Sequence, residues 1–192
     1  MLTRRHALML APAAILGAGL LGATIFTANR EPAAIPIGGP FALLDGDGKT
    51  VTDQAFRGRW MLVYFGYTHC PDACPTALQD MANALDQLGP KKKQVAIVFI
   101  TIDPERDTPT VMKDYVAAFE AGIVPLGGSQ DAVAAAAKAY RVYYAKHPSK
   151  DGGYDMDHSS IIYLMDQRGR FVANFTHETP PDQIAAKLKT LV

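Results

Sequence analysis

The two cysteines of this 192-residue chain, Cys70 and Cys74, lie close together, and the sequence contains no others. Pro71, Asp72 and Ala73 stand between them. Three intervening residues place the thiols about one helical turn apart, so both can point to the same side from the first turn of a helix. A thiol pair with this spacing can close a disulfide or bind a soft metal ion.

The residues around the cysteines predict a strand, a loop and then a helix. The apolar run 60–65 is typical of a buried strand, 66–69 of a loop, and 76–88 carries leucines and a methionine at helical intervals. Unpaired N–H groups and the helix dipole stabilise thiolates at such a helix N-terminus. Cysteines are often only small core hydrophobes. A segment with proline and aspartate is not an apolar stripe, so we expect chemistry at both thiols.

Composition limits the classes of protein to consider. Hydrophobic residues make up 48% of the chain, enough for one full core. The formal net charge is zero, so no basic surface argues for nucleic acid as a partner.

The N-terminal segment is predicted to be a membrane anchor. Arg4 and Arg5 precede an uncharged stretch from Ala7 to Ala28, as long as the roughly 20 residues that cross a bilayer. That length, and the lack of a small-x-small cleavage site near Ala28, favour an uncleaved anchor at 1–28. A cleaved secretory or twin-arginine signal is the alternative. Both predict export of the domain to the periplasm, and the anchor predicts a single-pass protein of the bacterial cytoplasmic (inner) membrane.

The remaining chain is predicted to form a short linker and one domain. Residues 29–40 are rich in proline and glycine and are typical of a linker, and 41–192 has an ordinary single-domain size. We expect this soluble domain to be a monomer.

Strands and helices alternate along the predicted domain. Strands are expected at 41–44, 49–52, 94–101, 124–126, 142–144, 161–165 and 171–175, and further helices at 109–119, 131–140 and 181–191. A β-α-β beginning and a β-β-α end, with thiols at the start of the first helix, are the thioredoxin-like arrangement: an α/β fold with a central mixed sheet flanked by helices.

A polar segment, 147–158, separates two of the predicted strands and ends in His158. We expect a long loop, and such loops in compact domains are usually functional or mobile. If the following strand borders the strand leading to Cys70, His158 can lie over the thiols. Two thiolates and an imidazole suit Cu(I), or Cu(II) with a further ligand. Because loop histidines commonly face solvent, this interpretation of His158 depends on the cysteines.

Three separated stretches, 66–75, 101–109 and 157–159, resemble the signature motifs of the Sco/SenC family. These are membrane-tethered copper proteins with a thioredoxin-like fold that take part in assembling cytochrome c oxidase. The resemblance implies that Cys70, Cys74 and His158 bind copper. It also implies that the protein delivers copper to, or reduces the cysteines of, the CuA centre in oxidase subunit II. Asp166 replaces a proline found in many relatives, which affects only a turn.

Several neighbouring residues are secondary candidates. His69 could be a fourth ligand, but a supporting position is expected because adjacent residues rarely bind one ion. Asp72 is expected to form the turn. Asp103 follows a buried strand and either lies near the site or organises the loop 103–109. Met156 and Asp157 flank the histidine and are candidates for occasional ligands.

Three functions are compatible with these residues. The first is a copper metallochaperone. The second is a thiol-disulfide oxidoreductase or a periplasmic redox or copper sensor, in which Cys70 and Cys74 are redox-active; this leaves open whether the protein is also an enzyme. The third, a thiol peroxidase, is disfavoured because its Pro-x-x-x-Thr-x-x-Cys pattern is absent: Thr68 is two residues before Cys70 instead of three, and Tyr64 stands where the proline would be needed four residues before Thr68. The sequence does not fix the oxidation state in which copper is carried or the oxidase that receives it. It also does not distinguish copper delivery from reduction of the partner's cysteines.

Overall fold

The computed structural model describes residues 36–149 and 152–192. The predicted anchor at 1–28, and most of the predicted linker, lie outside these residues. No helix within the described ranges is long and apolar enough to cross a membrane.

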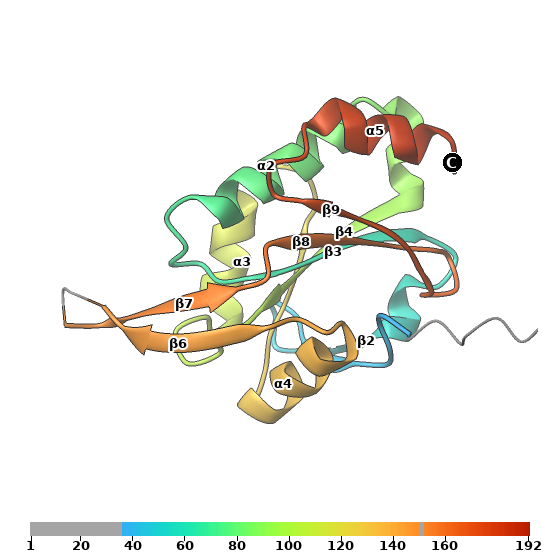
Figure 1. Cartoon of the computed structure of the whole chain (residues 1–192). Coiled ribbons are helices and arrows are strands. Elements are labelled where there is room, and N and C mark those ends of the chain that lie inside the picture. Colours follow the sequence, from blue (N-terminus) through green and yellow to red (C-terminus); the bar gives the residue numbers. More distant parts are fainter. Residues whose placement is uncertain (1–35, 150–151) are drawn as a thin grey trace, which may run out of the picture. The chain divides into compact units, whose positions relative to one another are not determined.

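The described chain alternates strands and helices (Figure 1). Its strands are β1 (Ala42–Leu44), β2 (Thr50–Thr52), β3 (Trp60–Gly66), β4 (Val95–Thr101), β5 (Val124–Leu126), β6 (Tyr144–Pro148), β7 (Tyr154–His158), β8 (Ile161–Met165) and β9 (Phe171–Thr176). Its helices are α2 (Ala73–Asp86), α3 (Pro109–Ala117), α4 (Gln130–Ala139) and α5 (Pro181–Lys189), with 3-10 segments η1 (Asp53–Phe56) and η2 (Gly89–Gln94).

A five-stranded mixed sheet forms the centre, in the order β5-β4-β3-β8-β9. The first three strands are parallel, and β8 and β9 run antiparallel to their neighbours. This is the thioredoxin-like arrangement that the sequence predicts. The condition set for the role of His158 is met: the strand after His158 borders the strand before Cys70, because β8 pairs with β3.

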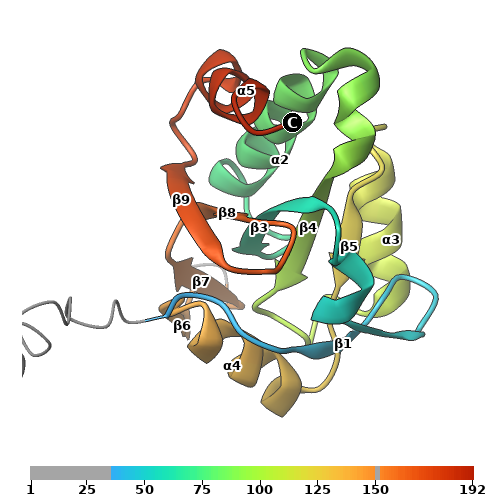
Figure 2. The same ribbon diagram turned by 90° about the vertical axis from the view of Figure 1, so that its right-hand side faces the viewer.

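Helices cover both faces of this sheet. α2 and α5 lie together on one face, and α4 lies on the other (Figures 1 and 2). Side chains alternate across β3. Tyr64 stacks on Phe99 on one face, whereas Phe65 contacts Tyr140 and Tyr163 on the other. β3 is therefore buried from both sides, which explains its unbroken apolar sequence.

The predicted long loop at 147–158 is wrong. Strands β6 and β7 pair with each other in antiparallel fashion as the two arms of a hairpin, which projects beside the main sheet (Figure 1). Alternation is present but subtle: Met156 is buried, while its neighbours Asp155 and Asp157 are exposed. The strand predicted at 142–144 begins only at Tyr144, after Arg141 adopts a left-handed conformation with φ 57° and ends α4.

Candidate metal centre

The cysteines lie where β3 gives way to α2, at the carboxyl edge of the sheet. We call residues 67–72 the cysteine turn. It carries Cys70, whereas Cys74 is the second residue of α2, which begins three residues before the predicted start at Thr76. The backbone N–H of Cys74 donates a hydrogen bond to the sulfur of Cys70 at 3.4 Å. The cysteine turn, and not helix geometry, therefore brings Cys70 beside Cys74, and the prediction that both thiols lie in the first turn of a helix is wrong for Cys70.

The two thiols differ in exposure. Cys70 is half-buried, and Cys74 has 0% of its surface exposed. Cys74 lies on the buried side of α2 with Leu78 and Met81, so the expectation that neither thiol belongs to an apolar face is wrong for this one. Cys74 is part of the core and of the site at once.

His158, the last residue of β7, completes the group. Its Nε2 atom lies 3.5 Å from the sulfur of Cys74, and one ligand atom from each of Cys70, Cys74 and His158 lies within 4.8 Å of the others. Its Nδ1 atom is 3.3 Å from the carbonyl oxygen of Ser159. Because a carbonyl only accepts, Nδ1 carries the hydrogen, and the lone pair of a neutral ring remains on Nε2, facing the sulfurs.

Two tyrosine rings hold the imidazole of His158. Tyr64 and Tyr67 contact it edge to face, with centroids 6.1 and 5.9 Å away. The hydroxyl of Tyr64 also lies 3.9 Å from the sulfur of Cys74 and can donate to it. Both tyrosines lie next to the cysteine motif, but the motif does not predict their contact with His158.

Gly66 provides room for the buried thiol. A Cβ atom at Gly66 would lie 2.7 Å from the sulfur of Cys74 and 3.0 Å from the ring of Phe99. Any side chain here would displace the thiol, so this close approach requires glycine.

The pKa values of the two thiols are shifted in opposite directions. The Cys74 thiol donates a hydrogen bond that lowers the pKa of Cys70 to about 3. The same hydrogen bond, together with burial, raises the pKa of Cys74 far above its ordinary value. The metal-free site therefore presents a thiolate at Cys70 and a protonated thiol at Cys74. A metal that binds both sulfurs must displace the second proton.

The secondary candidates lie outside the three-residue group. His69 has 53% of its side chain exposed, and its Nδ1 is 3.1 Å from the hydroxyl of Thr68. Asp72 is exposed and lies in the turn, as expected. Met156 is buried in the core, and Asp157 is exposed and pairs with the imidazole of His147 at 3.2 Å.

Asp103 organises its loop, which resolves the two alternatives left by the sequence. Its carboxylate accepts hydrogen bonds from Arg106 and from the hydroxyl of Tyr154, the latter at 2.8 Å. Asp107, a site residue that was not among the candidates, is 2% exposed and binds Thr68 in the cysteine turn. The motif at 101–109 was the available signal, but the partners of its side chains could not be read from it.

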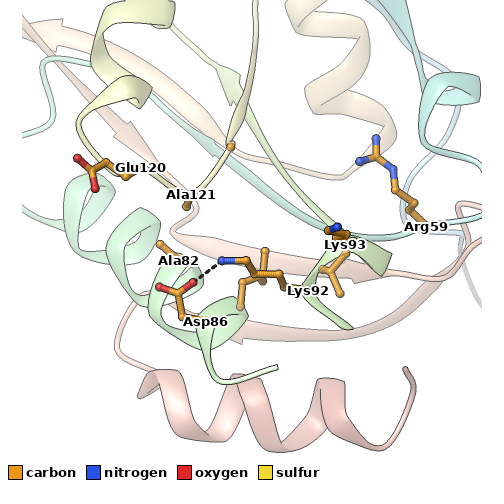
Figure 3. Close-up of a pocket in the computed structure, with 10 residues that line it drawn as sticks. Arg59, Ala82, Asp86, Lys92, Lys93, Glu120 and Ala121 are labelled. Atoms are coloured by element: carbon orange, nitrogen blue, oxygen red, sulfur yellow. Dashed lines mark hydrogen bonds and ion pairs between the residues drawn. The ribbon is translucent and has the colours of Figure 1, made fainter. Parts of the chain in front are cut away.

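A cavity of about 490 Å³ lies away from these residues (Figure 3). It is bounded by the end of α2, by η2 and by residues 120–122, and Arg59, Lys92 and Lys93 contribute its cations. Arg59 precedes β3 and Val95 begins β4, so the cavity lies at the amino edge of the parallel strands, opposite the cysteines. Its ten lining residues include no thiol or imidazole. The candidate centre is therefore set by side-chain chemistry and not by the size of a cavity.

Comparisons with known proteins agree with this geometry. A family model described as SCO1/SenC matches residues 29–192. The mitochondrial SCO1 homolog 1 of Arabidopsis thaliana is 44% identical over 137 residues, which cover 71% of this chain and 41% of that protein. A SCO2-like protein of Rickettsia prowazekii is 41% identical, with 73% and 70% covered. The chain thus spans less than half of the plant protein.

A solved structure is similar throughout the domain. Bradyrhizobium japonicum ScoI with copper bound is 47% identical, with a TM-score of 0.75, and the match covers 81% of this chain and 99% of that one. The likeness therefore supports the fold over most of this chain.

Proposed function

Because this chain belongs to the SCO1/SenC family, we propose that it is a copper-binding metallochaperone in the assembly of cytochrome c oxidase. The observation that carries the proposal is the convergence of Cys70, Cys74 and His158 within 4.8 Å. The copper-bound state of the similar ScoI structure supports the choice of metal. Two thiolates and one imidazole are ligands that Cu(I) prefers, and a further ligand would accommodate Cu(II).

The unequal burial of the three side chains suits a protein that passes its metal to an acceptor. Cys74 is fully buried and would hold the ion, whereas Cys70 and His158 are only partly buried. A cysteine of the acceptor could then displace His158 or Cys70 while Cys74 stays bound. Copper would pass through a mixed-ligand intermediate without entering solution.

The acceptor and the location follow from the family resemblance and the N-terminal sequence. We propose that the acceptor is the CuA domain of oxidase subunit II, which offers a pair of exported thiols. The segment 1–28 would anchor the protein in the bacterial inner membrane, with the domain in the periplasm. The soluble domain would act as a monomer.

A second function, thiol-disulfide reduction, is favoured by the unequal thiols. The Cys70 thiolate would attack a disulfide of the partner, forming a mixed disulfide and releasing one partner thiolate. Cys74, losing its proton, would then attack the Cys70 sulfur. This step releases the second partner thiol and leaves a Cys70–Cys74 disulfide, so two electrons pass to the partner. The same residues could thus prepare the CuA cysteines before metallating them.

The direct test is copper transfer by the full-length chain. We expect one copper per reduced chain and none once Cys70 and Cys74 are oxidised to a disulfide, because the disulfide consumes both thiolate ligands. Copper should then move to a reduced CuA domain on mixing. Equal copper binding by the oxidised and reduced protein would contradict the site. Normal CuA occupancy in a deletion strain with no second protein of this type would contradict the role and favour sensing.

A further inference from the structure

The loop that follows β4, residues 103–108, contributes none of the three candidate ligands, yet it contacts both segments that carry them. We call it the Asp103 loop. Its backbone is fixed from within, since the N–H groups of Arg106 and Asp107 both donate to the carbonyl of Asp103 at 3.2 and 3.0 Å. The N–H of Asp103 in turn donates to the hydroxyl of Thr101 at the end of β4. The loop is therefore a rigid extension of the central sheet.

One side of the Asp103 loop holds the cysteine turn. The carboxylate of Asp107 accepts from the N–H of Thr68 at 3.1 Å and from its hydroxyl at 2.6 Å. It also accepts from the hydroxyl of Thr101 at 2.6 Å. Thr68 is two residues before Cys70. A buried carboxylate with three hydrogen bonds thus joins the cysteine turn to β4.

The other side holds the β6-β7 hairpin at Tyr154, the first residue of β7. The guanidinium of Arg106 lies 3.8 Å from the centre of the Tyr154 ring, and its Nη1 donates to the carbonyl oxygen of the same residue at 3.0 Å. The hydroxyl of Tyr154 donates to Asp103 at 2.8 Å. The ring, the backbone and the hydroxyl of one residue are all bound by this loop. Arg106 also lies 5.7 Å from the ring of Tyr67, which contacts His158.

The hairpin needs such a fastening. β6 and β7 pair with each other and with no other described strand, so the main sheet provides no ladder to fix them. His158 lies at the opposite end of β7 from Tyr154. Because β7 is only five residues long, a rotation of the strand at Tyr154 also moves His158. A hairpin held loosely at Tyr154 would carry the imidazole away from sulfurs that the core holds in place.

We propose that Arg106 and Tyr154 are positioning residues for copper, which fix His158 over the thiols without touching the metal. The inference rests on the proposed copper function and extends it. Asp107, in the same loop, holds the cysteine turn through Thr68. Separate substitutions in the loop can therefore weaken the support of the thiols or the support of His158. A substitution that weakens the contacts at Tyr154 should reduce the contribution of His158 to copper affinity and leave the contribution of the two thiolates unchanged.

The first test needs no copper. Arg106→Gln in the full-length, reduced chain should speed amide hydrogen exchange in β7 and at Ser159, with little change in α2. Tyr154→Phe keeps the ring and carbonyl and should give a smaller change in the same amides. Arg106→Lys should fail to restore protection, because an ammonium lacks the planar group that can stack on the ring and bind the carbonyl at the same time.

Arg170→Gln is the matched control, since that arginine also pairs with an aspartate in its own turn. Unchanged exchange in β7 for Arg106→Gln would overturn the proposal, whatever the protein does with copper.

The second test reads the metal. Outer partners of a ligating histidine typically contribute about 10–100-fold to metal affinity, and we expect Arg106→Gln to lower Cu(II) affinity by about 10-fold. The sulfur-to-copper charge-transfer band and the nitrogen hyperfine pattern of the Cu(II) protein should change, whereas Cu(I) affinity changes less. In a His158→Ala background the same substitution should add nothing. An equal loss with and without His158 would overturn the positioning role, even if copper binding by the parent confirms the proposed function.

Discussion

The two segments that carry the candidate ligands are held by different means. The cysteine turn connects β3 and α2, two elements with fully buried faces, and Cys74 itself is part of the core. The hairpin that carries His158 pairs only with itself among the described strands. The buried side chain of Met156 and the polar and stacking contacts at Tyr154 hold it in place. Apolar packing is stiff and insensitive to solvent, whereas a stacked and hydrogen-bonded contact can open at modest cost. We therefore expect substitutions at Arg106 or Tyr154 to displace the imidazole more readily than the thiol pair.

The largest expected effect is on copper affinity, and it should differ between the thiolate and imidazole ligands. Cys74→Ala removes a thiolate that no neighbour can replace, and we expect Cu(I) affinity to fall by more than the ~100-fold typical of an outer partner. His158→Ala should cost less for Cu(I), which is satisfied by two thiolates, and more for Cu(II). Competition titration with a chromophoric chelator measures both.

A matched control for that series is Met156→Leu. Met156 flanks the histidine motif but is buried in the core, and the substitution conserves volume. Copper affinity should stay at the parent value. A loss comparable to that of His158→Ala would make Met156 a ligand and change the assigned donor set.

The next effect concerns the thiols alone. Because the hydrogen bond from Cys74 lowers the pKa of Cys70 to about 3, Cys70 is a thiolate throughout pH 5–8 and is protonated only at stronger acidity. Alkylation of Cys70 in the reduced, metal-free chain should therefore be nearly independent of pH in that window. An ordinary thiol with a pKa near 8.5 would slow by about tenfold per unit below it.

Cys74 should behave in the opposite way. Its pKa is raised and its side chain is buried, so it should resist alkylation in the folded chain and react only after unfolding. Peptide mass spectrometry after a timed pulse of iodoacetamide distinguishes the two cysteines. Equal labelling of both, or a Cys70 rate that climbs steadily to pH 8, would show that the thiols are not coupled as described.

The sequence predicted the thiol half of this comparison better than the imidazole half. Strand β3 and the start of a helix beside Cys74 follow from apolar runs and spacing, which are local signals. The pairing of β8 with β3, which brings His158 to the thiols, was only a condition in the sequence interpretation. The hairpin was mistaken for a loop because its alternation is carried mainly by one buried residue, Met156. The role of Arg106 depends on a partner 48 residues away in the chain, and no local pattern encodes such a contact.

A smaller effect should appear in stability, on the cysteine side. Asp107→Asn replaces one acceptor oxygen with an amide that faces the donors of Thr68 and Thr101. Leaving such buried groups unsatisfied costs about 1–3 kcal/mol, and we expect the free energy of unfolding in urea to fall by about that amount. Asp47→Asn is the control, because its pair with Lys113 is exposed on both sides. Equal stability of the two variants would mean that Asp107 does not join the cysteine turn to the sheet.

The smallest effect concerns the second cation on Tyr154. Lys146 lies 3.6 Å from the centre of the ring, as close as Arg106, and also pairs with Glu105. Its side chain, however, is 43% exposed against 24% for Arg106, and it donates nothing to the backbone of Tyr154. Solvent screens an exposed cation over a ring, so proximity alone should not fasten the hairpin. We expect Lys146→Gln to leave exchange in β7 and Cu(II) affinity within error of the parent, while Arg106→Gln changes both. If Lys146→Gln loosened β7 as much as Arg106→Gln does, stacking on the exposed side of the ring would hold the hairpin, and the fork of Arg106 would not be the decisive contact.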